Sequence, residues 1–374
     1  MAETKQAAVS SGDVLVLVGT MKGAFLFRSN GERRDWEMAG PWFQGEPVYA
    51  LTYDGRDGGR SLWAAPWSFF YGPSLRRSDD FGATWTDHES RPVRFPEGSE
   101  AELKRIWQID LGRGGADVAY CGVEPAALFA SRDGGESWSL VQGLWDHPQR
   151  PRWNPGAGGL CLHTIVRHGD DPQRLLVAVS AAGVYRSDDG GATWAPRNVG
   201  VRAQFLPEDQ RYPEFGQCVH KVAAHPSRPD RLFLQNHWGL YRSDDFGDSW
   251  HDVAHGVPSD FGFAMVVHPH DPDTVYIVPL ESDLFRCTPE AKLRVYRTRD
   301  AAASWQPLTN GLPQEDAYET VLRDALSVDT CATPGVYFGT RSGKVYASAD
   351  AGESWSAVVD GLPQVVCVRA AVVG

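Results

Sequence analysis

The sequence predicts an all-β fold, a seven-bladed β-propeller with four-stranded antiparallel blades that is closed by pairing of its N- and C-terminal strands. Three observations support this fold class. A short phrase ending in tryptophan recurs seven times along the 374 residues, short strand patterns fill the intervals, and strand patterns without a partner remain at both ends. A repeat of about 50 residues that carries several strands is typical of propeller blades.

The recurring phrase is predicted to be a turn between two strands. The glycine at its fifth position can adopt positive φ, and the aspartate two residues earlier can accept backbone N–H bonds. The opening serine or threonine can bond to the same carboxylate, and the closing tryptophan buries its ring where the next strand begins. The copies recur every 49 to 56 residues and end at Trp36, Trp85, Trp138, Trp194, Trp250, Trp305 and Trp355.

These phrases resemble the repeats of the Asp-box (BNR) family, whose motif is Ser-x-Asp-x-Gly-x-Thr-Trp. The motif is complete at residues 187–194. With serine in place of threonine it recurs at 131–138, 243–250 and 348–355. The copy at 298–305 has Ala302 in place of the glycine, and the copy at 29–36 keeps little beyond its ends. The resemblance spans the whole chain and implies the propeller fold.

The resemblance implies no single function, because sialidases, sortilin-type receptors, xyloglucanases and photosystem assembly factors share the motif. The chain is most similar to single-propeller members without a characterised function. It departs from sialidases, since Arg105-Ile106 follows a box instead of preceding the first one, and seven blades are counted where sialidases usually have six. Sialidase activity is therefore not expected. Xyloglucanase-type enzymes pair two propellers around a cleft, and one is predicted here.

Four strand patterns are clearest in the fifth repeat, at residues 218–224, 231–235, 239–243 and 249–253. At the N-terminus, residues 13–28 supply two strands and Trp36 opens a third. The run 365–371 is left over at the C-terminus, and we expect it to complete the first blade as its innermost strand, leaving no free sheet edge. Residues 13–374 are thus expected to form a single domain after a flexible N-terminus at residues 1–12.

Composition narrows the function classes. The net charge of −12 argues against nucleic acid or an anionic membrane as a partner. No window approaches the roughly 20 apolar residues of a membrane span, and the first residues lack the apolar region of a signal peptide. Six cysteines spread over the chain form no disulfide framework, which favours the cytoplasm, with a secreted form whose signal was removed as the alternative. Composition does not indicate the oligomeric state.

The blade topology predicts where function lies. Box turns occupy one face of the propeller, and the long links that enter the innermost strands occupy the other. Such links are usually functional. They include residues 143–159, 197–216 and 251–262, and a further insertion spans 281–294.

A cluster of ring and charged side chains is predicted at the mouth of the axis on that face. Aligning the innermost strands superposes His163, His220 and Phe263, and two adjacent blades carry Cys-x-His, at 161–163 and 218–220. Strand alternation puts each cysteine on the side of its histidine. His163, His220 and His237 are predicted to bind one divalent ion (Zn, Mn, Fe, Ni or Cu) or to act as acid–base groups.

The other site residues are assigned from the same alignment. The predicted catalytic set is His163, His220, Arg105, Asp324, Arg323 and Glu124. The arginines would hold an anion. The predicted substrate-binding set is Tyr49, Trp107, Phe263, Trp238 and Lys104. In the alternative interpretation the histidines tie neighbouring blades by hydrogen bonds, and the paired cysteines are small packed hydrophobes.

The sequence contains no motif for nucleotide binding, for a serine nucleophile or for a zinc finger. There is no phosphate-binding glycine loop before a helix, so no nucleotide cofactor is expected, and neither a nucleophile elbow nor a zinc-finger spacing occurs. Two functions remain. The first is a hydrolase or lyase acting on a small polar or anionic molecule at the axis mouth. The second is a non-catalytic binding or assembly scaffold, in which the long loops grip a protein partner.

Overall fold

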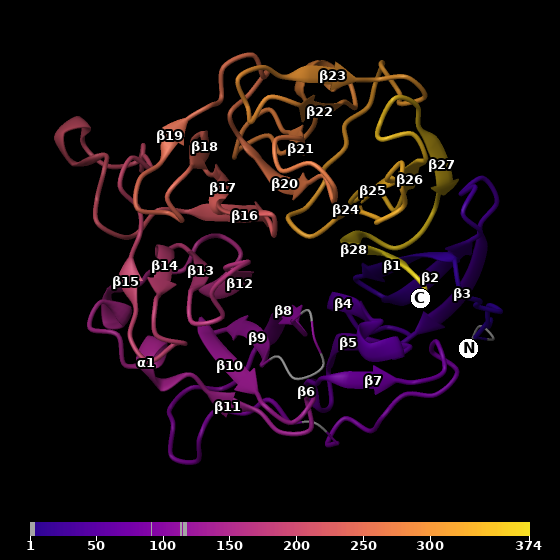
Figure 1. Cartoon of the computed structure of the whole chain (residues 1–374), viewed down its shortest axis with the longest axis horizontal. Coiled ribbons are helices and arrows are strands. Elements are labelled where there is room, and N and C mark those ends of the chain that lie inside the picture. The colour runs from indigo at the N-terminus through magenta and orange to yellow at the C-terminus, as the bar shows by residue number, and fades with distance from the viewer. Residues whose placement is uncertain (1–3, 91, 113, 115–117) are drawn as a thin grey trace. The chain divides into compact units, whose positions relative to one another are not determined.

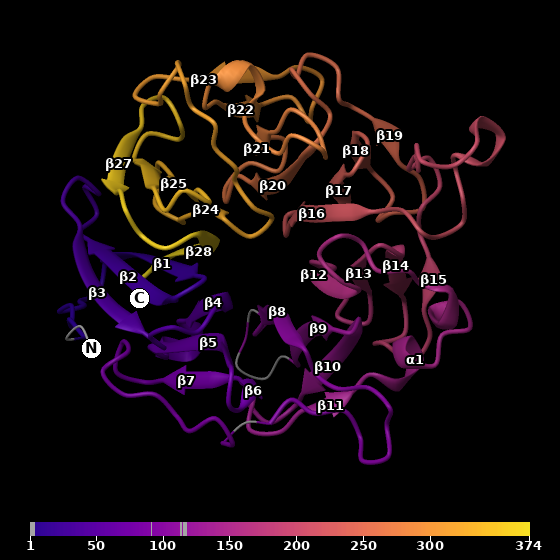
Figure 2. The ribbon, with the colours of Figure 1, turned by 180° about the vertical axis from the view of Figure 1, so that it is seen from behind.

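The computed structural model describes residues 4–90, 92–112, 114 and 118–374. It confirms the predicted fold class, because the described residues form seven four-stranded antiparallel sheets, the blades of a β-propeller (Figures 1 and 2). Helix in this part of the chain is limited to α1 (Gln142–Trp145) and 3-10 turns at Arg56–Gly58, Arg150–Arg152, Glu208–Gln210 and Pro289–Ala291. None of the described helices is long and apolar enough to cross a bilayer.

The chain divides into two compact units. Unit 1 comprises Met1–Val123, Phe129–Leu140 and Asp324–Gly374, and unit 2 comprises Glu124–Leu128 and Val141–Arg323. The single domain expected over residues 13–374 stays a prediction. Of the segment 1–12, residues 1–3 lie outside the described residues, and the backbone of Lys5 pairs with that of Gly40.

Three sheets lie wholly in unit 1. The first joins β28 (Val365–Val372), β1 (Val14–Thr20), β2 (Gly23–Ser29) and β3 (Glu37–Trp42). The second joins β4 (Val48–Asp54) to β5 (Ser61–Ser68), which pairs with both β6 (Gly72–Pro73) and β7 (Arg76–Ser78). The last joins β24 (Leu326–Val328), β25 (Val336–Gly339), β26 (Val345–Ser348) and β27 (Ser356–Val359).

The C-terminal strand completes the first sheet, as predicted. Strand β28 (yellow in Figure 1) pairs antiparallel with β1 (indigo), in a register that places Val14 opposite Val372 and Val18 opposite Val368. Every residue of β1 is buried. Burial on both faces explains its uninterrupted apolar run, since such a strand needs no polar positions.

Three sheets lie wholly in unit 2. They are β12 (Cys161–Arg167), β13 (Leu175–Ser180), β14 (Gly183–Ser187) and β15 (Ala195–Pro196); β16 (Val219–His225), β17 (Arg228–Asn236), β18 (Leu240–Ser243) and β19 (His251–Asp252); and β20 (Gly262–Val267), β21 (Val275–Pro279), β22 (Val295–Thr298) and β23 (Gln306–Leu308). The first two of these sheets share a core that includes Leu176, Leu234 and Trp250.

The seventh sheet joins β8 (Arg105–Asp110), β9 (Ala119–Glu124), β10 (Ala127–Ser131) and β11 (Ser139–Leu140).

Six of the recurring phrases adopt the predicted turn. In residues 187–194 the Ser187 hydroxyl donates to Asp189 (2.8 Å) and accepts from the Gly191 N–H (2.8 Å). The Thr193 hydroxyl donates to the second oxygen of the same carboxylate (2.6 Å). Ala302 keeps a left-handed φ of 69° despite its Cβ, so the copy without glycine still forms the turn.

Acid is expected to unfold the protein through these turns. The hydrogen bond from Thr193 contributes most to lowering the pKa of Asp189 to about 2. The pKa is also lowered in the other box aspartates, Asp80, Asp133, Asp245, Asp300 and Asp350. An unfolded aspartate has a pKa of about 3.9, so the stabilisation is complete above about pH 4 and is lost as pH falls toward the folded values.

Denaturant unfolding between pH 5 and pH 2 measures this effect. The slope of the unfolding free energy against pH gives the number of protons taken up on unfolding. This number should decrease by about one in Asp189→Asn. It should stay unchanged in Asp209→Asn, whose side chain is exposed on the loop 197–216. An unchanged pH dependence in Asp189→Asn would contradict the assignment.

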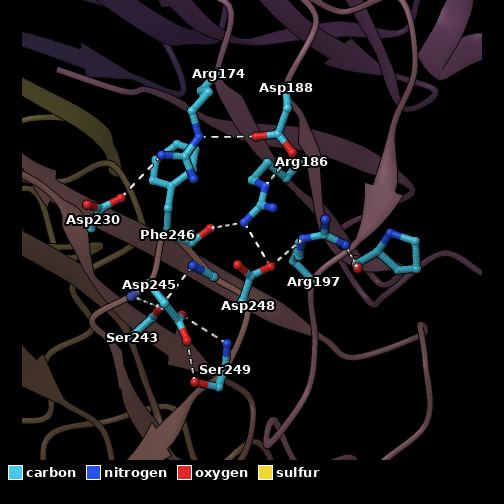
Figure 3. A network of polar contacts seen from close by, with 12 residues as sticks. Arg174, Arg186, Asp188, Arg197, Asp230, Ser243, Asp245, Phe246, Asp248 and Ser249 are labelled. Carbon is cyan, nitrogen blue, oxygen red and sulfur yellow. Dashed lines mark hydrogen bonds and ion pairs between the residues drawn. The ribbon is translucent and has the colours of Figure 1, made fainter. Parts of the chain in front are cut away.

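Arginines of one blade hold the box turn of the next in unit 2 (Figure 3). Arg186 in β14 donates to the Phe246 carbonyl (3.1 Å) and pairs with Asp248 (2.9 Å), and Arg197 pairs with the same carboxylate (3.0 Å). The Trp250 indole N–H donates to the Arg197 carbonyl (2.9 Å). Single exposed ion pairs contribute little, but several converging on one turn fix its position. The network therefore joins one blade of unit 2 to the box turn of the next.

Candidate functional site

Two histidines occupy equivalent positions in adjacent blades of unit 2. His163 lies in β12 and His220 in β16, and the strand register shifts at each of them. An irregularity of this kind re-aims a side chain away from simple strand alternation. His163 is fully buried, and His220 is 3% exposed.

Both ring nitrogens of His163 are engaged. Its Nδ1 lies 2.9 Å from Thr164 Oγ1, and its Nε2 lies 3.0 Å from the carbonyl oxygen of Val219, at the start of β16. Because a carbonyl only accepts, Nε2 carries the proton and Nδ1 accepts from the hydroxyl. His163 therefore links two neighbouring blades.

His220 makes the corresponding link with the opposite nitrogen. Its Nδ1 donates to the carbonyl of Gly262, at the start of β20, over 2.6 Å. The Nε2 atom of this tautomer keeps a lone pair, and it lies 3.7 Å from Cys218 Sγ. The residue after His220 is Lys221, which has no hydroxyl, whereas Thr164 follows His163. This one-residue difference is a sequence signal that separates the two histidines.

His237 lies in the turn after β17 and faces the same place. Its Nε2 is 3.2 Å from Asp283 Oδ2, on the insertion between β21 and β22. The ring centroids of His237 and His220 are 5.2 Å apart, and the Trp238 ring is 4.2 Å from that of His237. When Nε2 donates to the carboxylate, Nδ1 keeps the lone pair.

Cys218, His220 and His237 form one group of donor atoms. One ligand-type atom from each lies within 4.8 Å of the others. Two buried phenylalanines line the group, with the Phe263 ring 4.5 Å from His220 and the Phe261 ring 5.1 Å from His237. The structure thus places a thiol and two imidazoles against an apolar wall.

Burial keeps this group neutral. It lowers the pKa of His220 well below the ordinary value, and it also lowers the pKa of His237, where the hydrogen bond with Asp283 acts in the opposite direction. Burial raises the pKa of the Cys218 thiol. Both imidazoles are therefore uncharged at neutral pH, with lone pairs available for a proton or a metal ion.

Two arginines add positive charge beside the group. Arg323 Nε donates to the His220 carbonyl (2.5 Å). Arg286 Nε donates to the Asp283 carbonyl (3.1 Å), and its guanidinium lies 5.5 Å from the centre of the Phe263 ring. Both charges oppose protonation of His220 and favour a thiolate at Cys218. An anion would be stabilised at this position for the same reason.

Unit 2 brings five of the predicted site residues together, namely His220, His237, Trp238, Phe263 and Arg323. His163 shares the Cys-x-His pattern of His220, but its ring bonds to the neighbouring blade. Glu124 lies against the loop 156–159, because a Cβ on Gly159 would come within 2.3 Å of Glu124 Oε1.

Unit 1 holds the remaining predicted residues, which are Tyr49, Lys104, Arg105, Trp107 and Asp324. The Arg105 guanidinium lies 4.1 Å from the centre of the Tyr49 ring and 5.0 Å from that of Trp107. Lys104 is exposed immediately before β8. Asp324 is buried and pairs with Arg369 in β28 (2.9 Å). It therefore anchors the C-terminal strand.

Three polar residues of this region were not assigned a role from sequence. Asp283 and Arg286 lie on the insertion at 281–294, whose position between two strands was the only signal available. Asp260 pairs with Arg202 (3.2 Å), and burial raises its pKa. The pKa of Asp283 is lowered, chiefly by the hydrogen bond with His237. Two carboxyl groups that interact with one imidazole are thus shifted in opposite directions.

Fold and cluster together define a seven-bladed β-propeller protein with a Cys-His-His group in its second unit. No family model matches the sequence. Over 243 residues the chain is 28% identical to the oligoxyloglucan-reducing end-specific xyloglucanase of Emericella nidulans, a match that covers 56% of this chain. The chain spans only 29% of the length of that relative.

Solved structures show the likeness of fold. An ancestral GH74 enzyme is 18% identical with a TM-score of 0.56, covering 84% of this chain and 38% of that one. YCF48 bound to a D1 peptide is 14% identical with a TM-score of 0.51, covering 83% and 81%. Apo AztD from Citrobacter koseri is 9% identical with a TM-score of 0.55, covering 96% and 98%.

Proposed function

We propose that the protein is an enzyme of the hydrolase or lyase class that acts on a small polar or anionic substrate at the Cys218-His220-His237 group. The observation that carries the proposal is the convergence of this group with two guanidinium charges. Convergent polar groups beside an apolar wall are typical of small-molecule sites.

The residues suggest a division of roles. Arg286 and Arg323 would hold an anionic group of the substrate, because guanidinium groups bind carboxylate and phosphate oxygens through paired N–H donors. His237, whose side chain is 15% exposed, would move a proton while Asp283 fixes its orientation. A histidine positioned by a carboxylate is a common general base.

The hydrolase class has support from two further observations. The opposite pKa shifts of Asp260 and Asp283 are the pattern expected of a proton donor and a proton acceptor in one site. The sequence match is to a xyloglucanase, and glycoside hydrolysis uses two carboxyl groups in these roles.

Because none of the six cysteines forms a disulfide, we also place the protein in the cytoplasm.

A panel of chromogenic esters, phosphate esters, sulfate esters and glycosides, in neutral and anionic forms, tests this function. Turnover of an anionic substrate should be lost in His237→Gln. In Arg286→Met, kcat/KM for anionic substrates should fall roughly 10- to 100-fold, the worth of a charged hydrogen bond, with little change for neutral ones. His251→Ala, an exposed histidine on β19, is the matched control and should keep full activity.

Two results would contradict the proposal. One is turnover that stays equal in wild type, His237→Gln and Arg286→Met. The other is Arg286→Met reducing activity on neutral and anionic substrates by the same factor, since this would indicate a general loss of structure.

A binding scaffold is the second candidate, and a specific surface favours it. Phe69, Phe70 and Tyr71 form the tip between β5 and β6 and are 83%, 85% and 66% exposed. Exposed apolar clusters of this kind mark interaction sites. For this function, Phe69→Ser with Phe70→Ser should abolish partner binding while His237→Gln retains it.

A further inference from the structure

We propose that Cys218, His220 and His237 are the protein ligands of a transition-metal site, with zinc as the expected ion. Thiolate sulfur and imidazole nitrogen are the ligands that zinc prefers. The inference rests on the proposed function and deepens it, since it names a cofactor for the same site and makes His237 a metal ligand instead of a proton carrier. Metal binding can be measured without any substrate. It also replaces His163, the third ligand expected from sequence, with Cys218.

The spacing between Cys218 Sγ and His220 Nε2 fits a tetrahedral ion. Zinc bonds of about 2.3 Å to sulfur and 2.0–2.1 Å to nitrogen place two such ligands about 3.6 Å apart. Cys218 Sγ and His220 Nε2 are 3.7 Å apart. The atom contributed by His237 lies within 4.8 Å of both. For all three residues to share one ion, the distance to the His237 atom has to shorten toward about 3.6 Å.

Each imidazole is already oriented as a metal ligand. Histidines that bind a metal usually donate their other N–H to a carbonyl or a carboxylate, which sets the tautomer and the ring orientation. His220 donates to the Gly262 carbonyl through Nδ1, over 2.6 Å. His237 contacts Asp283 Oδ2 through Nε2, at 3.2 Å. The nitrogens that remain, His220 Nε2 and His237 Nδ1, are the proposed ligand atoms.

The neighbouring blade supplies an internal comparison. Cys161 and His163 repeat the Cys-x-His pattern of Cys218 and His220. Both nitrogens of His163 are engaged, one with Thr164 and one with the Val219 carbonyl. The same sequence pattern thus gives a structural pair in one blade and a metal-ligand pair in the next.

Charge explains why a thiolate belongs in this set. Arg286 and Arg323 lie beside the group and would repel a cation held by neutral ligands alone, whereas a cysteine that loses its proton on metal binding would compensate one of these charges. Three protein ligands leave a fourth zinc position for water or a substrate oxygen, as in catalytic zinc sites. Zinc in such a site lowers the pKa of a bound water to about 7. The two arginines favour an anion at that position.

The first experiment is metal analysis of the untagged full chain, followed by zinc titration against a chromophoric chelator. One zinc per chain is expected in the wild type. Cys218→Ser and His237→Ala should each weaken zinc binding by more than 100-fold. Asp283→Asn should weaken it by roughly 10- to 100-fold, the usual effect of losing the outer partner of a histidine ligand. Cys161→Ser is the matched control and should bind zinc like the wild type.

Cobalt substitution identifies the sulfur ligand directly. The cobalt-loaded wild type and Cys161→Ser should show a thiolate-to-cobalt charge-transfer band in the near ultraviolet, and Cys218→Ser should lack it. His220 is left unchanged in this series because its link to Gly262 is structural, and circular dichroism confirms that the variants are folded. Equal zinc affinity in Cys218→Ser and wild type, or absence of the band in wild-type protein, would overturn the proposal.

The metal site and the proposed activity can fail separately. Stoichiometric zinc that depends on Cys218 and His237, without turnover in the substrate panel, would support the metal site and remove the enzymatic function. Turnover that depends on His237 but persists in metal-free protein and in Cys218→Ser would retain the enzyme and overturn the metal site.

Discussion

Removal of residues 365–374 is expected to prevent folding of unit 1. The first part of β28 is buried, with Val365, Val366 and Val368 at 0–5% exposure. Burying three valines contributes about 5–9 kcal/mol at roughly 1.5–3 kcal/mol each. A domain is stable by only about 5–15 kcal/mol in total. Deletion would also expose the edge of β1, which invites aggregation. Circular dichroism and light scattering measure both effects.

A circular permutant separates the loss of the strand from the loss of chain connectivity. The Gly12 N–H donates to the Val373 carbonyl (2.8 Å), so the end of β28 lies beside the start of β1. A chain opened between the exposed Asp360 and Gly361, with Gly374 joined to Gly12 by a short glycine linker, lacks residues 1–11 but keeps the pairing of β28 with β1. It should fold. A soluble, folded deletion variant would show that β28 is dispensable.

Loss of the Asp329 carboxylate is expected to destabilise the protein by about 3–5 kcal/mol, as measured for broken buried ion pairs. Asp329 is fully buried and accepts hydrogen bonds from Arg33 (3.1 Å), the Tyr337 hydroxyl (2.6 Å) and the Gly335 N–H (2.9 Å). Asp329→Ala leaves the Arg33 charge without this partner. Urea unfolding of the two proteins measures the difference.

The control for this prediction is Arg34, the residue after Arg33. Arg34 has a side chain that is 82% exposed, and Arg34→Ala should change stability by less than about 0.5 kcal/mol. Arg33→Ala should be nearly as damaging as Asp329→Ala, and the double variant should cost less than the sum of the two. Strictly additive losses would show that the two side chains do not act as a pair.

This ion pair also explains the copy of the box at residues 29–36. This copy departs from the motif in sequence, because the aspartate and the glycine of the motif are missing. In the structure Arg33 takes a left-handed φ of 55° and donates to the Thr333 carbonyl as well as to Asp329. A side chain directed at a neighbouring blade thus anchors this copy, whereas a local carboxylate holds each of the other six turns. No local pattern predicts a contact between residues 296 positions apart.

The sequence by itself determined the fold class and the closure of the first blade. Each box carries its own turn chemistry, and local signals of this kind are repeated often enough that individual departures, such as Ala302, do not obscure them. The first blade lacked one of its four strands, and the run at residues 365–371 was the strand pattern left to complete it. Local conformational preference and a count of strands were sufficient because neither depends on the positions of distant side chains.

Only the tertiary structure decided which of the ring nitrogens and carboxylates meet. His163 and His220 share the Cys-x-His pattern, yet Thr164 and two backbone carbonyls direct their nitrogens differently. Asp283 reaches His237 from 46 residues away on an insertion whose path has no periodic signal. Hydrogen-bond geometry depends on fractions of an ångström between elements, whereas strand patterns depend only on which residues are apolar. That is the physical reason why the blades could be predicted and the composition of the donor group could not.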